Sequence, residues 1–130
     1  MLKKDEVFYL ENNGSVINIH ANIFLKRNRS IYDELIKHVV DVITKANESF
    51  DMYVNMDKIK PLQLDFDFIK DFIILLQNLF PNRLNKCYIL NCSILCKTLY
   101  DNFKFFIDKK NHPKIEFIMQ TPTAVKPSNY

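Results

Sequence analysis

The chain has 130 residues, 48% of them hydrophobic, and a formal net charge of +3. This length favours one domain, and the apolar content is sufficient for a packed core. The net charge is too small for a basic face that tracks phosphates, and Arg27, Arg29 and Arg83 are the only arginines, so we expect no nucleic-acid partner.

The N-terminus and the cysteines indicate a cytoplasmic protein. Met1-Leu2 is followed at once by the charged residues 3–6, whereas a signal peptide carries an apolar segment there. No apolar run approaches the about 18 residues that span a bilayer. The three cysteines are an odd number, which favours a reducing compartment over a set of disulfides.

The first third of the chain predicts a hairpin and a helix. Residues 6–10 and the alternating residues 16–21 flank Asn13-Gly14, the dipeptide most typical of a tight hairpin turn. Residues 22–29 are expected to form a loop. Ser30 is expected to cap an amphipathic helix, because a hydroxyl at that position accepts a hydrogen bond from the first turn.

The rest of the chain predicts three further strands and two helices. Residues 50–57, 86–91 and 115–119 are apolar enough for strands of a parallel sheet. The helix expected over 65–80 has an apolar arc of about half its circumference, so we expect it to be covered on more than one side. Ser93 is expected to cap a third helix, which extends to about Ile107.

The predicted order is therefore β-β-α-β-α-β-α-β, an α/β fold. Strands that alternate with helices indicate a mainly parallel sheet, and the first strand of the hairpin adds an antiparallel edge. We expect one domain over residues 1–120 and a C-terminal tail over 121–130, which has two prolines and no periodicity.

The sequence contains no arrangement typical of an enzyme or a cofactor site. Gly14 is its only glycine, so phosphate-binding loops and dinucleotide fingerprints are excluded. Cys87, Cys92 and Cys96 lack zinc-site spacing, and we interpret them as reduced apolar residues, with a reactive Cys92 thiol as the alternative. The acidic residues 65, 67 and 71 are interpreted as partners of a helix dipole. We expect no metal and no cofactor.

Four segments carry a family resemblance. Phe80-Pro81-Asn82-Arg83 resembles an aromatic-Pro-acidic-Arg turn, and residues 86–93 resemble a Lys-aromatic-Tyr-Ile-Ile-Asn-Ala-Pro strand. Residues 105–108 and 114–118 resemble Pro-Phe-Leu-Asp and Lys-Ile-x-Phe-Leu segments, and a strand that ends at Asp57 precedes them all. In this order and spacing the region from residue 50 to 119 resembles the CRAL-TRIO domain family, the lipid-pocket fold of phosphatidylinositol transfer proteins. The family's N-terminal helical lobe has no counterpart in the sequence.

The resemblance implies a non-enzymatic module that binds or transfers a phospholipid or another hydrophobic ligand. It implies that the third helix is the gate over the lipid pocket. The residues expected to line or approach the ligand are Leu99, Phe103, Phe106, Lys114 and Arg83. Lys114 matches the basic residue that meets the inositol phosphate in phosphoinositide-binding members, and Asn82 stands where those members have its acidic companion.

The third helix also predicts contact with a membrane surface. Phe105 lies away from the main apolar stripe of this helix, and Lys109 and Lys110 are close to it in sequence. Lysines beside an exposed aromatic side chain are attracted to an anionic bilayer. The alternative is a solvated lysine face with Phe105 beneath the C-terminal tail.

Two other functions remain open at this stage. The first is a protein-interaction scaffold with a collapsed pocket, which binds a protein partner or forms a homo-oligomer. The second is a STAS-like regulatory domain, although residues 61–67 contain no Ser or Thr that could be phosphorylated. A cavity of roughly 300–1,000 Å³ beneath Phe103 and Phe106 would favour the lipid hypothesis, and a filled core would favour the scaffold.

Overall fold

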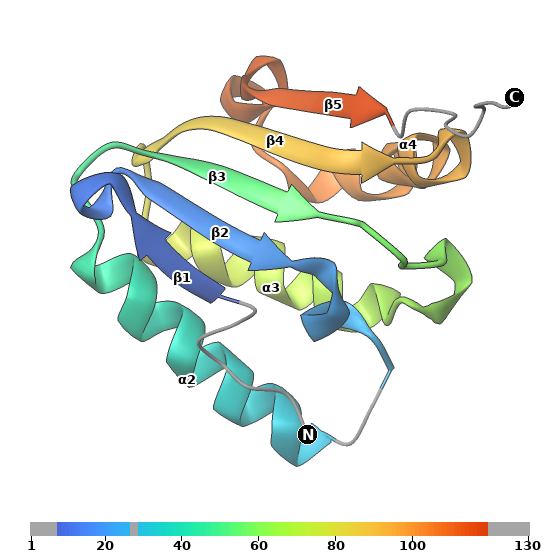
Figure 1. Ribbon diagram of the computed structural model, residues 1–130, viewed down its shortest axis with the longest axis horizontal. Coiled ribbons are helices and arrows are strands. Elements are labelled where there is room, and N and C mark those ends of the chain that lie inside the picture. The colour runs from blue at the N-terminus through green and yellow to red at the C-terminus, as the bar shows by residue number, and fades with distance from the viewer. Residues whose placement is uncertain (1–7, 27–28, 120–130) are drawn as a thin grey trace, which may run out of the picture.

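A sheet of five strands in the order β1-β2-β3-β4-β5 forms the centre of the computed structural model, which describes residues 8–26 and 29–119 (Figure 1). Strands β2 to β5 are parallel, and β1 lies antiparallel to β2 at the edge. The predicted α/β class with a mainly parallel sheet is confirmed. The predicted tail over 121–130 lies outside the described residues. The strands are β1 (Phe8–Glu11), β2 (Val16–His20), β3 (Phe50–Asn55), β4 (Leu84–Cys92) and β5 (Ile115–Met119).

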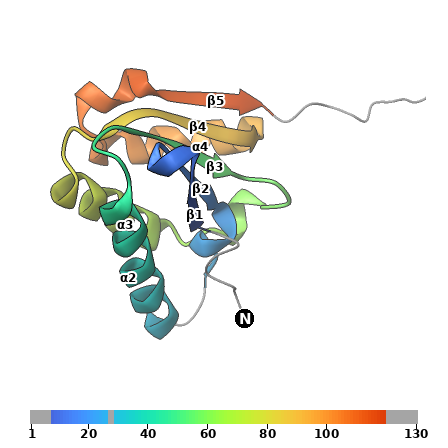
Figure 2. The same ribbon diagram turned by 60° about the vertical axis from the view of Figure 1, so that its left-hand side comes forward.

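Three α-helices lie on one face of the sheet (Figures 1 and 2). They are α2 (Arg29–Lys45), α3 (Phe66–Leu79) and α4 (Ile94–Phe103). The helices pack on this face because it is apolar: the strand register places four apolar side chains in one row across the parallel strands. This row consists of Ile17, Met52, Cys87 and Ile115.

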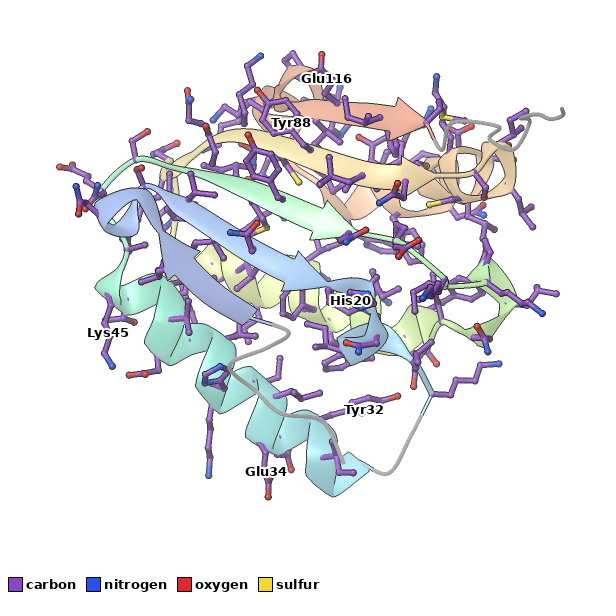
Figure 3. All side chains as sticks on the ribbon, viewed as in Figure 1. His20, Tyr32, Glu34, Lys45, Tyr88 and Glu116 are labelled. Carbon is purple, nitrogen blue, oxygen red and sulfur yellow. The ribbon has the colours of Figure 1, made fainter. Side chains whose placement is uncertain are left out.

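The opposite face of the sheet has a polar and aromatic row. Asn18, Tyr53, Tyr88 and Glu116 are neighbours across the four parallel strands, and the Tyr53 and Tyr88 rings lie 4.9 Å apart. Tyr88 and Glu116 project from this face in Figure 3, on the side away from the helices. Within residues 8–26 and 29–119, no helix covers it.

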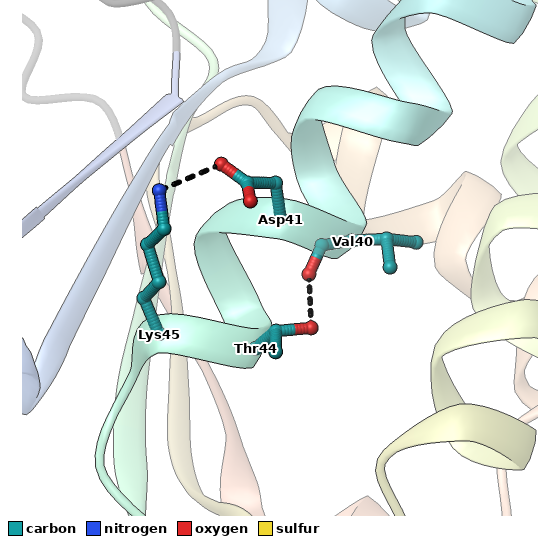
Figure 4. Close-up of polar contacts among 4 residues, drawn as sticks. All are labelled: Val40, Asp41, Thr44 and Lys45. Atoms are coloured by element: carbon teal, nitrogen blue, oxygen red, sulfur yellow. Dashed lines mark hydrogen bonds and ion pairs between the residues drawn. The ribbon is translucent and has the colours of Figure 1, made fainter.

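Helix α2 is amphipathic, as its sequence predicts. Leu35, Val39 and Ile43 are almost fully buried against the sheet. On the outer side, Lys45 Nζ lies 3.1 Å from Asp41 Oδ2 and the Thr44 hydroxyl donates to the carbonyl oxygen of Val40 (Figure 4). The helix begins at Arg29, so Ser30 lies inside it and the prediction of Ser30 as the N-cap residue is wrong.

Gly14 is required by the turn between β1 and β2. Its φ of +89° lies in the left-handed region, which disfavours a side chain. An added Cβ would also lie 3.2 Å from Asn47 Oδ1, and the carbonyl oxygen of Gly14 accepts a hydrogen bond from the Asn47 amide. The turn is thereby joined to the end of α2.

The loop that we expected over residues 22–29 is wrong for its first part, residues 22–24. Residues 21–24 form a 3-10 helix, and Ile23 has no exposed surface. The Tyr32 hydroxyl donates to the carbonyl oxygen of Leu25 and to Asp65 Oδ2, and its ring stacks on Phe68 at 4.1 Å. The segment is too short to show a periodic pattern, and its packing depends on contacts with both α2 and α3. The sequence pattern therefore did not predict it.

Asp65 caps α3, because its side chain accepts a hydrogen bond from the Phe68 amide at 3.0 Å. This observation supports its interpretation as a helix-terminus residue rather than an acid-base group. Ser93 caps α4 in the same way, through the Cys96 amide. The third helix is shorter than predicted: α4 ends at Phe103, and 3-10 helices follow over residues 104–106 and 109–114.

Candidate functional site

An apolar cavity of about 260 Å³ lies between α3, α4 and the helical face of the sheet. Its floor is formed by strands β3, β4 and β5, with Val54, Ile89 and Phe117 among the residues that line it. Its walls are the facing sides of α3 and α4. Nearly all of its surface is apolar, because each of these elements turns its hydrophobic side inward.

Helix α4 closes the cavity on one side. Leu99 and Phe103 line it, as does Tyr100, whose ring meets Phe117 edge-to-face at 5.0 Å. Burial and the nearby Cys87 thiol raise the pKa of Tyr100. Leu99 and Phe103, which the resemblance implies as ligand-contacting residues, thus face the cavity.

Phe106 does not line the cavity, contrary to expectation. The α-helical phase ends at Phe103, and the 3-10 turn that follows directs Phe106 elsewhere. Its ring lies beneath Lys70 Nζ, 4.9 Å from the centroid. The prediction assumed an uninterrupted α-helix to Ile107.

Polar groups gather at one end of the cavity. Gln77 of α3 donates to the carbonyl oxygen of Phe106 at 2.7 Å, and its Oε1 accepts from the Asp108 amide at 2.8 Å. Asn111 Nδ2 lies 3.4 Å from the same Oε1. Gln77, Asp108 and Asn111 all line the cavity, as does Lys110. Gln77 thus attaches the segment after α4 to α3.

Arg83, which the resemblance places near the ligand, is not among the residues that line the cavity. Its Nη2 donates to the carbonyl oxygens of Ile43, Ala46 and Asn47 at 3.2, 2.9 and 3.0 Å. The guanidinium also lies over the rings of Phe50 and Phe80. Arg83 therefore satisfies carbonyls at the C-terminal end of α2 and just beyond it, where helical partners run out, although the Ile43 carbonyl also accepts from the Ala46 amide at 3.0 Å.

Lys114 also lies outside the cavity lining. It ends the 3-10 helix that precedes β5, and it is half-buried. The expected partnership with Asn82 belongs to Lys110 instead, whose Nζ lies 2.6 Å from Asn82 Oδ1. Because Asn82 and Lys110 both line the cavity, the basic group near its polar end is Lys110 rather than Lys114.

Phe105 is 82% exposed. It follows α4 directly, and Lys109 and Lys110, which are also exposed, come four and five residues later. At the opposite end of α4, Ile94 is 77% exposed and Leu95 is 50% exposed. Both ends of the helix that covers the cavity therefore present apolar side chains to solvent.

A family model described as the CRAL/TRIO domain matches residues 20–125, which is most of the chain. The chain belongs to the CRAL/TRIO domain family. The crystal structure of Sfh5 superimposes with a TM-score of 0.66 at 15% sequence identity, and the match covers 86% of this chain and 48% of the Sfh5 chain. The chain thus spans about half the length of Sfh5. The search of curated proteins found no match.

This assignment decides the fold family that the sequence left open. The CRAL/TRIO match includes α3, β4, α4 and β5, the elements that enclose the cavity. The STAS-like alternative loses its support, because the shared order of strands and helices was its only basis. Among the described residues, no helix is long and apolar enough to cross a membrane.

The cysteines of this CRAL/TRIO domain lie close to the cavity. Cys87 and Cys96 line it, and Cys92 has no exposed surface. Burial raises the pKa of Cys87 to about 12, and burial together with the Cys96 thiol raises the pKa of Cys92 to about 12. A reactive cysteine needs the opposite shift, so the direction of these pKa shifts supports the apolar interpretation over an activated Cys92.

The sequence did not identify the α3 side of the cavity. Phe72, Ile73 and Leu76 line it together with Gln77. The wide apolar arc of α3 was the available signal, since it predicted that the helix is covered on two sides. One side meets the sheet and α2, and the other side meets the cavity.

Proposed function

We propose that this CRAL/TRIO domain is a non-enzymatic, cytoplasmic module that holds a lipid or another apolar ligand between α3, α4 and the sheet. The observation that supports this most directly is the apolar cavity of about 260 Å³ at that place. Leu99 and Phe103 would contact the ligand from α4. Polar groups at one end would meet its head.

An empty apolar cavity is costly, which gives the ligand a physical role. Side chains around a void lose contacts that a packed core would provide. An apolar ligand restores those contacts and removes its own surface from water. The family membership is consistent with such a ligand, and the raised pKa values of Cys87 and Cys92 are opposite to the shift that an enzyme nucleophile needs.

The exposed ends of α4 support ligand exchange at a membrane. Phe105, Ile94 and Leu95 would enter the interface, and Lys109 and Lys110 would meet anionic head groups. Because α4 also covers the cavity, such contact would act directly on the element that must move for a ligand to enter. The domain would then be a peripheral membrane protein during exchange.

A tryptophan substitution at a cavity position tests the proposal. Leu99→Trp fills the cavity and is expected to abolish retention of any lipid, measured by native mass spectrometry and by extraction of the purified protein. Asn102→Trp is the matched control, since Asn102 lies on the same helix, is exposed and does not line the cavity. Equal lipid retention by both variants, or a wild-type protein that stays empty after incubation with vesicles, would refute the proposal.

A second candidate function is protein interaction through α3. Ile74 is 36% exposed and Leu79 is 49% exposed on this helix, although both are apolar. This scaffold function predicts self-association that depends on concentration and that Ile74→Ser with Leu79→Ser removes. A monomer over the whole concentration range of a sedimentation experiment, with no binding of an apolar dye, would count against it.

A further inference from the structure

We propose that the cavity selects single-chain lipids of about ten carbons with an uncharged polar head over two-chain phospholipids. This inference rests on the proposed function, because it specifies the ligand of the same cavity. It follows from the volume of the cavity, from the way α4 is attached to α3, and from the charges at the polar end.

The volume admits one short chain. An apolar cavity of about 150 Å³ accommodates benzene, which has six carbons. On the same scale, the 260 Å³ between α3 and α4, which is open to solvent on one side, buries on the order of ten carbon atoms, and further carbons of a chain would lie in water. The two acyl chains of a membrane phospholipid contain several times that number. The cavity also falls just below the roughly 300–1,000 Å³ typical of sites for larger ligands.

Contacts between the walls oppose widening. The Phe103 ring of α4 lies 5.7 Å from the Phe66 ring of α3. Further along, Gln77 of α3 binds the backbone of Phe106 and Asp108 at 2.7 and 2.8 Å. A second acyl chain would need α4 to move away from α3, which would break these contacts at both places.

The polar end has no net charge. Asp108 and Lys110 line the cavity there with the amide side chains of Gln77, Asn82 and Asn111. A phosphate head would meet one lysine and one carboxylate, and Lys110 already donates to Asn82 Oδ1. Arg83, whose guanidinium could pair with a phosphate, is bound to the carbonyls of α2. A hydroxyl head, which both donates and accepts hydrogen bonds, suits this mixture of groups.

A series of straight-chain alcohols tests the chain length. Calorimetric titration of the full chain with alcohols of about eight to about sixteen carbons should show affinity that rises about fourfold per methylene and then levels off near ten carbons. Decyl phosphate should bind at least tenfold more weakly than decanol. An affinity that keeps rising to about sixteen carbons, or a phosphate that binds as tightly as the alcohol, would overturn the inference.

Enlarging the cavity gives a second readout. Leu76→Ala removes three carbons from the cavity wall, so the plateau should move to about thirteen carbons. Leu79→Ala is the matched control, since Leu79 is exposed on the same helix and does not line the cavity. If Leu76→Ala does not fold, Leu99→Ala replaces it, with Asn102→Ala as its control, since Asn102 is exposed on the same helix and does not line the cavity. A plateau that stays at the same length in the enlarged variant would refute the inference.

The two proposals fail in different ways. Vesicles of phosphatidylcholine with phosphatidylinositol are offered to the same protein. If a two-chain lipid is retained, and Leu99→Trp abolishes its retention while the alcohols do not bind, the inference on chain number is wrong and the proposed lipid-binding function stands. If neither the alcohols nor the phospholipids bind, the proposed function itself is wrong.

Discussion

Replacement of Arg83 by methionine should destabilise the fold without removing ligand binding. Methionine keeps an apolar stem of similar length but removes the guanidinium, which lies over the rings of Phe50 and Phe80. The carbonyl oxygens of Ile43, Ala46 and Asn47 then lose their shared donor. The variant therefore tests whether Arg83 stabilises the fold or contacts the ligand, as the family resemblance implies.

The size of the effect follows from these contacts. A hydrogen bond from a charged donor contributes about 1.5–3 kcal/mol. The three carbonyls share one NH₂ group, which has two protons, and water can replace part of the loss at the exposed Asn47. We therefore expect the free energy of unfolding to fall by about 3 kcal/mol. For a chain of this size that corresponds to a decrease in Tm of about 12 °C.

Urea denaturation followed by circular dichroism measures this change. Lys86→Met is the control, because Lys86 lies exposed on β4, three residues after Arg83, and should change the stability by less than about 0.5 kcal/mol. Ligand binding by Arg83→Met, measured below its Tm, should equal that of the wild type. A loss of stability under about 0.5 kcal/mol, or a selective loss of ligand affinity, would refute the structural role.

Two further predictions concern the cysteines and Gln77. Because burial raises the pKa of both Cys87 and Cys92 to about 12, iodoacetamide at about pH 8 should label neither in the folded protein and both in urea. The ordinary thiol value is 9.0, so their contribution to stability is complete below about pH 9 and is lost as the pH rises toward 12. Gln77→Leu removes the acceptor of the Asp108 amide, and we expect faster hydrogen exchange at that amide by at least tenfold.

Each of these predictions has its own control. Alanine at both Cys87 and Cys92 should reduce the loss of stability above about pH 9, and an unchanged pH profile would contradict the assigned pKa values. Asn78→Leu alters the exposed residue next to Gln77 and should leave exchange at the Asp108 amide unchanged. Equal exchange rates in the two leucine variants would show that Gln77 does not hold this segment.

The sequence predicted the elements of the fold more accurately than their ends. Strand β5 has the predicted bounds, and Asp65 and Ser93 act at helix N-termini as expected. These features depend on neighbouring residues, so they can be inferred locally. The end of α4 was misplaced because its apolar pattern continues into a 3-10 turn, and the assignment of Phe106 failed with it.

The sequence by itself determined the element order, the apolar sides of the helices and strands, and the family resemblance. Tertiary structure alone decided where Arg83, Lys110 and Lys114 act, because their partners are distant in sequence: Arg83 meets a helix end about forty positions earlier, and Lys110 meets Asn82. It also decided the cavity. Periodicity shows which side of an element is apolar. The cavity volume of about 260 Å³, by contrast, is the space left between β3, β5, α3 and α4, so it depends on how these elements are placed relative to one another.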